Sequence, residues 1–225
     1  MTREFTRNMF IMLIAILVGV VIITFFIADI MRQSQIDTLN IEHKTQIQTI
    51  TYKNENFTDH FFQGIVQMDS AREVREIGNY HFDFGLFWYS NAYNNFSEKY
   101  ITNCIDNCTL AMTNYLKSYE SFNLSKPYFE NAQLFTNQSK YLEVLGYYVR
   151  FAQSGKNITL LRHTASKYLK HAAENLSNGN LDNVSLLMDL FNETEEAYGD
   201  EVGSYNDYRG QIDEYWFFDE IREPH

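Results

Sequence analysis

Two cysteines one helical turn apart are the residues of this sequence best suited to redox or metal chemistry. Cys104 and Cys108 are its only cysteines, and both fall on the apolar stripe predicted for one helix. Outside the cytoplasm such a pair can be oxidised, although an i,i+4 disulfide would distort the helical turn. The spacing leaves open a local disulfide, two buried thiols, or a metal or redox site. For such a site, His163 and His171 are the nearest additional ligands.

Asparagine in the pattern Asn-x-Ser/Thr is the second chemical signal. With 21 asparagines and with 28 serines and threonines among 225 residues, chance gives about two to three such sequons. The chain has nine, so we expect N-glycosylation of a surface that has been translocated across a membrane. Asn-rich composition with Asn and Ser in helix caps is the competing explanation. The nine acceptors are Asn56, Asn95, Asn107, Asn123, Asn137, Asn157, Asn175, Asn183 and Asn192.

No other pattern in the sequence indicates catalysis. The nucleotide-binding, zinc-protease and serine-hydrolase motifs that can be recognised locally are absent. His43 and His60 fall on or beside an apolar stripe, where histidine usually packs. The stretch 193–223 holds eleven acidic residues against two arginines, which predicts a solvated acidic face rather than a calcium site. We therefore expect a chain without a cofactor, metal or catalytic site.

An apolar segment near the N-terminus sets the location of the chain. Residues 9–28 contain no charge and one polar side chain, and about 20 helical residues span one hydrocarbon core. The run is longer than the apolar core of a signal peptide and lacks a small-residue cleavage site. Arg3 and Arg7 favour a cytoplasmic N-terminus. The sequence thus predicts a cytoplasmic tail at 1–8, a single transmembrane helix at 9–28, and an extracytoplasmic remainder.

The membrane helix is expected to continue outward as a stalk over 29–76. Neither glycine nor proline occurs between Gly19 and Gly64, so nothing interrupts the helix. Residues spaced alternately by four and three form a heptad seam with polar members, which indicates either a weak coiled coil or a helix within a larger bundle. The seam consists of Ile36, Asn40, His43, Ile47, Ile50, Asn54, Phe57, Phe61, Gly64 and Met68.

Aromatic side chains crowd the stretch 80–96, where eight of 17 residues are Phe, Trp or Tyr and point to all sides of a helix. Such a helix is either central in a bundle or shared with a partner or an apolar ligand. A second aromatic group, 215–218, is too short to cross a membrane. The candidate interface or pocket residues are Tyr80, Phe84, Phe87, Trp88, Tyr215 and Trp216.

Apolar stripes at helical spacing continue over the rest of the chain and predict an all-α fold. We expect breaks at Ser125-Lys126-Pro127, at Gly155, at Ser177-Asn178-Gly179, and at Gly199 and Gly203. Short loops favour an antiparallel helical bundle over 77–225. TPR-like hairpins are the alternative, although no 34-residue period is present.

Charge and organisation together narrow the function. The net charge is −11, which excludes the basic footprint of a nucleic-acid binder. One membrane span without catalytic motifs predicts a non-catalytic, membrane-anchored surface protein. We expect it to be a structural or accessory subunit with a protein partner or a second copy. The alternative is an extracytoplasmic sensory or ligand-binding module that uses the aromatic helix 80–96.

Overall fold

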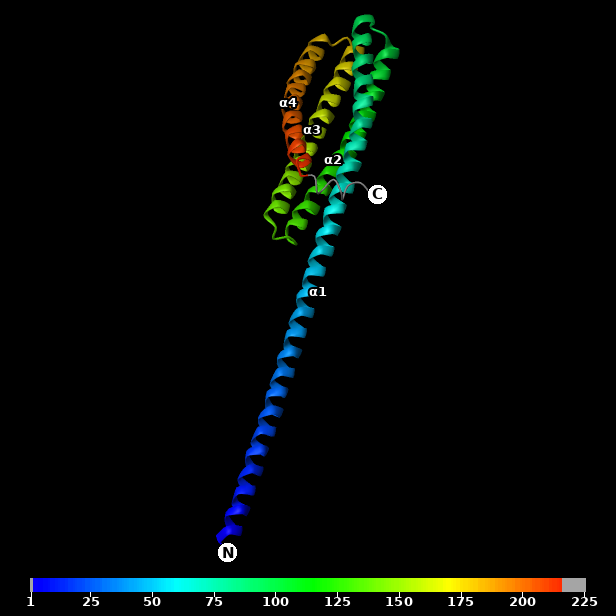
Figure 1. Ribbon diagram of the computed structural model, residues 1–225. Helices are drawn as coiled ribbons and strands as arrows, with labels where there is room; N and C mark the ends of the chain where they lie inside the picture. The colour runs from blue at the N-terminus through cyan, green and yellow to red at the C-terminus, as the bar shows by residue number, and fades with distance from the viewer. Residues whose placement is uncertain (1, 216–225) are drawn as a thin grey trace. The chain divides into compact units, whose positions relative to one another are not determined.

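The computed structural model describes residues 2–215, with side chains from residue 17 onward, and this part of the chain is helical without any strand. It contains four helices: α1 (Thr2–Asn95), α2 (Glu98–Gln133), α3 (Ser139–Ser177) and α4 (Leu181–Asp213) (Figure 1). The prediction of an all-α chain is confirmed. α1 passes without interruption through residue 76 and includes the aromatic stretch up to Asn95.

Contacts divide the chain into two units, Met1–Tyr52 and Lys53–His225. In the first unit α1 exposes its apolar side chains; Leu17 is 61% exposed and Phe25 is 74% exposed. By length and composition, α1 is the one helix among residues 17–215 that can cross a membrane, and its apolar segment lies near the N-terminus. A signal sequence meets the same two criteria.

In the second unit, buried positions repeat every seven residues along the helices. On α2, the buried residues follow alternate steps of three and four from Ile101 to Ala132. On α4, Val184, Phe191, Tyr205 and Ile212 are multiples of seven apart. A seven-residue repeat keeps one face of a helix against its neighbours over many turns, as in coiled coils.

Glycines on α1 lie directly opposite aromatic side chains of α2. The Phe129 ring lies over Gly64, and the Tyr115 ring lies over Gly78, so close that a Cβ at either glycine would stand within 3 Å of the ring. As residue numbers rise along α1 they fall along α2, so the two helices run in opposite directions. This alternation of size lets the two backbones approach closely.

Four of the predicted helix breaks are absent. Ser125 and Pro127 lie inside α2, Gly155 lies inside α3, and Gly199 and Gly203 lie inside α4. These predictions were wrong because each helix keeps its buried face in phase through the site of the expected break.

At two of these sites the packing itself explains why the helix continues. Ser125 is buried, and its hydroxyl donates to the Phe122 carbonyl oxygen at 2.8 Å instead of capping a new helix. Burial of Phe122 and Phe129 on either side offsets the roughly 3 kcal/mol that an internal proline costs. Gly155 is required for a different reason, because a Cβ there would lie 2.4 Å from the Phe122 ring.

The connections that follow α1 and α3 each contain one residue in the left-handed backbone conformation. Gly179 has φ of +68° at the end of α3, and the Asn180 amide donates to the Asn175 carbonyl oxygen at 3.0 Å. This is the Schellman arrangement, and it confirms the stop predicted at 177–179. Phe96 ends α1 with φ of +48°, a conformation that is costly for a residue with a side chain.

The apolar interior of the second unit falls into two clusters. One cluster gathers around Phe61, Phe129 and Tyr148, and the other gathers around Phe82, Cys108 and Leu169. Residues numbered between the two clusters on each helix are more polar. These intervening side chains form the candidate functional site.

Candidate functional site

A half-buried ion pair lies between the two apolar clusters. The Arg162 guanidinium on α3 donates to the Glu195 carboxylate on α4 at 2.5 Å, and the two side chains are 17% and 27% exposed. The guanidinium also stacks over two rings, 4.5 Å from the Phe82 ring centre and 3.8 Å from that of Tyr198. Arg162 therefore joins α1, α3 and α4 through one side chain.

Burial and ion pairing have opposite effects on the pKa of each of these two residues. Burial alone would lower the pKa of Arg162, but the neighbouring Glu195 and Tyr198 outweigh it and the pKa is raised. For Glu195, burial raises the pKa of the carboxyl group, and the attraction of Arg162 only partly offsets that effect. Loss of either partner would leave a partly desolvated charge, which is more costly than loss of an exposed pair.

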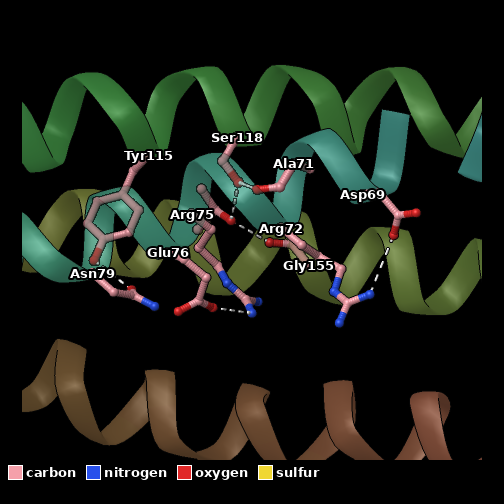
Figure 2. A network of polar contacts seen from close by, with 10 residues as sticks. Asp69, Ala71, Arg72, Arg75, Glu76, Asn79, Tyr115, Ser118 and Gly155 are labelled. Atoms are coloured by element: carbon pink, nitrogen blue, oxygen red, sulfur yellow. Dashed lines mark hydrogen bonds and ion pairs between the residues drawn. The ribbon is translucent and has the colours of Figure 1, made fainter. Parts of the chain in front are cut away.

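Ser118 links three helices in the same layer. Its hydroxyl on α2 donates to the Ala71 carbonyl oxygen of α1 at 2.7 Å, and it lies 3.4 Å from the Thr159 hydroxyl of α3. Figure 2 shows Ser118 turned toward Ala71, with Gly155 close by. Thr159 in turn donates to the Gly155 carbonyl oxygen at 2.7 Å, so these buried hydroxyls are satisfied.

Tyr115 and Arg75 complete this layer on the α1 side (Figure 2). The Tyr115 hydroxyl donates to the Asn79 side-chain oxygen at 2.9 Å, and burial raises its pKa far above the ordinary value. Arg75 lies 4.9 Å from the ring centre of Tyr205 and pairs with Glu76 at 3.4 Å. We call Arg75, Tyr115, Ser118, Thr159, Arg162 and Glu195 the central polar layer.

The central polar layer links the helices through polar contacts that are only partly satisfied, because Nε of Arg75, Nε of Arg162 and Oε1 of Glu195 are buried without a hydrogen-bond partner. Within residues 17–215 no three His, Cys, Asp or Glu side chains are grouped closely enough to hold a metal ion. Sequence analysis did not single out Arg162 or Glu195. The available signal was an arginine in phase with Gly155, Leu169 and Leu176 on the buried face of α3.

The two cysteines are free thiols buried in the second cluster. Their Sγ atoms are 3.9 Å apart, well beyond the roughly 2.05 Å of a disulfide bond. The adjacent Cys108 thiol, together with burial, raises the pKa of Cys104 far above its ordinary value. A thiol held protonated and inaccessible is a poor nucleophile and a poor metal ligand. His163 and His171, the suggested extra ligands, are half-buried on α3.

The nine sequon asparagines divide by exposure. Hydrogen bonding does not separate the two groups, because the half-buried Asn107 and the exposed Asn95 each donate to a carbonyl oxygen four residues earlier, both at 2.9 Å. The exposed side chains are the ones open to a glycan. Asn95, Asn123, Asn137, Asn183 and Asn192 are exposed, and Asn56, Asn107, Asn157 and Asn175 are half-buried.

Of the four aromatic residues on α1 that were predicted to form an interface or a pocket, three are exposed and one is half-buried. Tyr80 is 59% exposed, Phe84 is 39% exposed and Phe87 is 56% exposed. Trp88 is half-buried and stacks on Tyr100 with 5.6 Å between ring centres. The exposed rings follow steps of four and three, so they share one side of the helix, and Ile77 extends that side toward the N-terminus. We call Ile77, Tyr80, Phe84 and Phe87 the aromatic face.

The remaining sequence candidates do not converge on a common site. Tyr215 is half-buried, with its ring centre 6.3 Å from that of Tyr147, and Trp216 lies outside the described residues. His43 is exposed, whereas His60 packs against Phe135 with 5.5 Å between ring centres. In the acidic stretch, Glu201 accepts a hydrogen bond from Ser154 at 2.6 Å, so part of this stretch contacts α3.

Comparison with protein-family models, with curated proteins and with solved structures gives no match to this chain.

Proposed function

We propose that this chain is a single-pass membrane-anchored surface protein whose antiparallel helical bundle serves as a non-catalytic structural or accessory subunit of a membrane assembly. In this proposal residues 9–28 cross the membrane, the N-terminus is cytoplasmic, and the bundle is extracytoplasmic and N-glycosylated. The observation that carries the proposal is the aromatic face, which lies on the same helix as the apolar segment.

The aromatic face has the character of a protein interface. Its members lie on the side of α1 away from Gly78, Phe82 and Gly85, which face the interior. Large rings grouped on a surface are enriched at protein contacts, because they bury much area for little loss of conformational freedom. We infer that the partner is a second membrane protein that offers an apolar surface to these rings.

A small-molecule site is the second candidate, since a depression of about 260 Å³ is lined by Asp83, Phe84 and Phe87. Two rings beside a carboxylate suit an organic cation. However, the three residues come from a single stretch of one helix, and ligand pockets usually enclose about 300–1,000 Å³ between elements. The geometry favours a flat protein contact over an enclosed ligand.

Mild-detergent purification of the tagged full chain tests the proposal directly. We expect a partner in stoichiometric amount, and the double substitution Phe84→Ser/Phe87→Ser should reduce its recovery at least about tenfold, as for loss of interface hot spots. Leu124→Ser/Leu186→Ser is the matched control, because these leucines are 52% and 59% exposed on α2 and α4. Equal recovery from both double variants would refute the aromatic face as the contact.

The ligand alternative has its own readout. Trp88 lies next to Phe87, with 4.9 Å between ring centres, so its fluorescence reports on that depression. If the chain purifies alone, and tetramethylammonium quenches or shifts that fluorescence in the native chain but not in Asp83→Asn, the ligand-binding proposal replaces the accessory one.

Separate measurements test whether the chain is anchored in a membrane and whether its bundle lies outside the cytoplasm. The proposal predicts that the native chain stays in the membrane pellet after alkaline extraction. It also predicts that glycosidase treatment shifts the mass of the protein. Release by alkali would show that residues 9–28 are not an anchor.

A further inference from the structure

The part of the heptad seam that precedes the bundle exposes three isoleucines among polar residues. In the described structure Ile36 is 41% exposed, Ile47 is 62% exposed and Ile50 is 59% exposed. These residues, with Asn40, His43 and Asn54, are the uncovered seam. Isoleucines exposed at one face of a helix leave apolar area in contact with water, which burial against another helix would remove.

The uncovered seam has the same phase as the buried face of α1. From Asn54 the alternate steps of three and four continue to Phe57, Phe61, Gly64 and Met68, of which the last three are buried. In heptad notation, Asn40, Ile47, Asn54 and Phe61 are a positions, and Ile36, His43, Ile50 and Phe57 are d positions. One repeat therefore continues through both units of α1, and in the second unit it forms the buried face of the helix.

The face opposite the uncovered seam is mixed in character. Thr38, Thr45 and Thr49 lie on that face, and each hydroxyl donates to a carbonyl oxygen four residues earlier, at 2.8–2.9 Å, so these hydroxyls need no partner. Ile41 and Tyr52 lie beside them and are 67% and 60% exposed, but neither has an apolar neighbour three or four residues away on that face, as two of the seam isoleucines do. The nine sequons begin at Asn56, so glycans would not obstruct the uncovered seam.

We propose that residues 32–54 form a parallel two-stranded coiled coil with a second copy of this chain. Asparagine at a positions specifies a two-stranded coil, since two copies of Asn40 can hydrogen-bond to each other across the seam, as can two copies of Asn54. In a parallel pair the g position of one chain meets the following e position of the other. Here that pairing sets Arg32 of one copy against Asp37 of the second, two opposite charges.

The shared direction of the two helices rests on the proposed membrane anchor, because two chains inserted in one membrane leave it in the same sense. Anchoring also raises the local concentration of the second copy. That effect matters because three heptads with polar a residues associate weakly when they are free in solution.

Disulfide trapping of the full chain tests this dimer. Ile36→Cys, Ile47→Cys and Ile50→Cys place a thiol in the seam, whereas Thr38→Cys and Thr45→Cys place it on the opposite face. Under mild oxidation the seam variants should give at least about fivefold more covalent dimer than the two threonine variants. The native chain is the blank, since Cys104 and Cys108 are fully buried.

Trapping between identical positions requires two helices in parallel and in alignment. An antiparallel pair would be trapped only near the middle of the overlap, and a partner of different sequence would not be trapped as a homodimer. Either result, or equal yields on both faces, would overturn the proposal.

Particle mass provides a second measurement that does not depend on oxidation. In mild detergent, Ile47→Lys/Ile50→Lys should halve the mass of the protein component, and Thr45→Lys/Tyr52→Lys should leave it unchanged. The alkaline extraction above separates the two proposals. Release by alkali with seam-specific trapping would refute the anchor alone, whereas retention without seam-specific trapping would refute the coiled coil alone.

Discussion

At the scale of single residues, Gly155 illustrates how one missing side chain shapes the interior. The Phe122 ring fills the place of its Cβ, at 2.4 Å from where that atom would be. We expect Gly155→Ala to lower the free energy of unfolding by about 1–3 kcal/mol, the usual cost of overpacking an interior. Urea unfolding followed by circular dichroism measures the change.

Gly146 supplies the matched control on the same helix. A Cβ at Gly146 meets no atom within 4 Å, so Gly146→Ala should stabilise the protein by about 0.5–1 kcal/mol through helix propensity alone. Changes of the same sign in both variants would contradict the role assigned to the Phe122 ring.

His163 predicts a pH dependence of stability. Burial, and then the charge of Lys167, lower its pKa in the folded chain below the ordinary value of about 6.5. Below that pH the unfolded chain binds more protons, so stability is complete above it and falls as the pH decreases. Unfolding midpoints measured from pH 7.5 to 5 should decline less in His163→Gln than in the native chain.

A neighbouring substitution tests the assignment to His163. Leu160→Gln adds the same side chain on α3 at a position that is 48% exposed, and it leaves the histidine in place. It should keep the native pH dependence. A native slope in His163→Gln as well would show that other groups cause the decline.

At the scale of helices, α2 shows that a continuous buried face outweighs a local breaking residue. Pro127 is exposed within the helix and lacks the amide that would bond to the Asn123 carbonyl oxygen. Pro127→Ala restores that bond and should raise the free energy of unfolding by about 1–3 kcal/mol. Thermal unfolding of the full chain measures it, and an unchanged or lower midpoint would contradict this account.

The sequence predicts which segments are helical better than it predicts where each helix ends. The seven-residue spacing of apolar residues is local, so the all-helical character and the stop at Gly179 could be predicted. Gly155 could not be distinguished from a helix end, because its reason is a ring 33 residues earlier in the chain. Ser125 resembles an N-cap until its burial is known.

The same limit applies to the candidate site. Exposure of Tyr80, Phe84 and Phe87 depends on which side of α1 the other helices cover, and the all-round aromatic pattern does not contain that information. Arg162 and Glu195 are 33 residues apart, and only the pairing of α3 with α4 brings them together.

At the scale of the whole second unit, the Arg162–Glu195 pair links α3 to α4 by an interaction that exists only in the folded chain. Arg162→Met leaves the half-buried Glu195 carboxylate without its partner, and we expect a loss of about 1–3 kcal/mol. Arg162→Met/Glu195→Leu removes both charges and should recover most of that loss. Chemical denaturation of the three proteins forms a double-mutant comparison.

An exposed ion pair is the control for this comparison. Arg209 and Asp213 are 3.7 Å apart, one turn from each other on α4, with side chains 57% and 50% exposed. Arg209→Met should change the unfolding free energy by less than about 0.5 kcal/mol. A similar loss from Arg209→Met and Arg162→Met would show that burial does not distinguish the two pairs.

The alternation of large and small residues between α1 and α2 has a consequence for how the chain finds its fold. Because the alternation repeats every seven residues, sliding one helix past the other by one repeat again sets rings over small residues. Size complementarity alone therefore permits slipped alignments of nearly equal energy. Ser118 has a buried counterpart one repeat away in Ser125, but Arg75, Arg162 and Glu195 have only glycine or apolar residues seven positions away on either side. These charged members of the central polar layer therefore distinguish the native alignment from a slipped one. A chain with an apolar layer would keep most of its stability yet refold into mixed alignments.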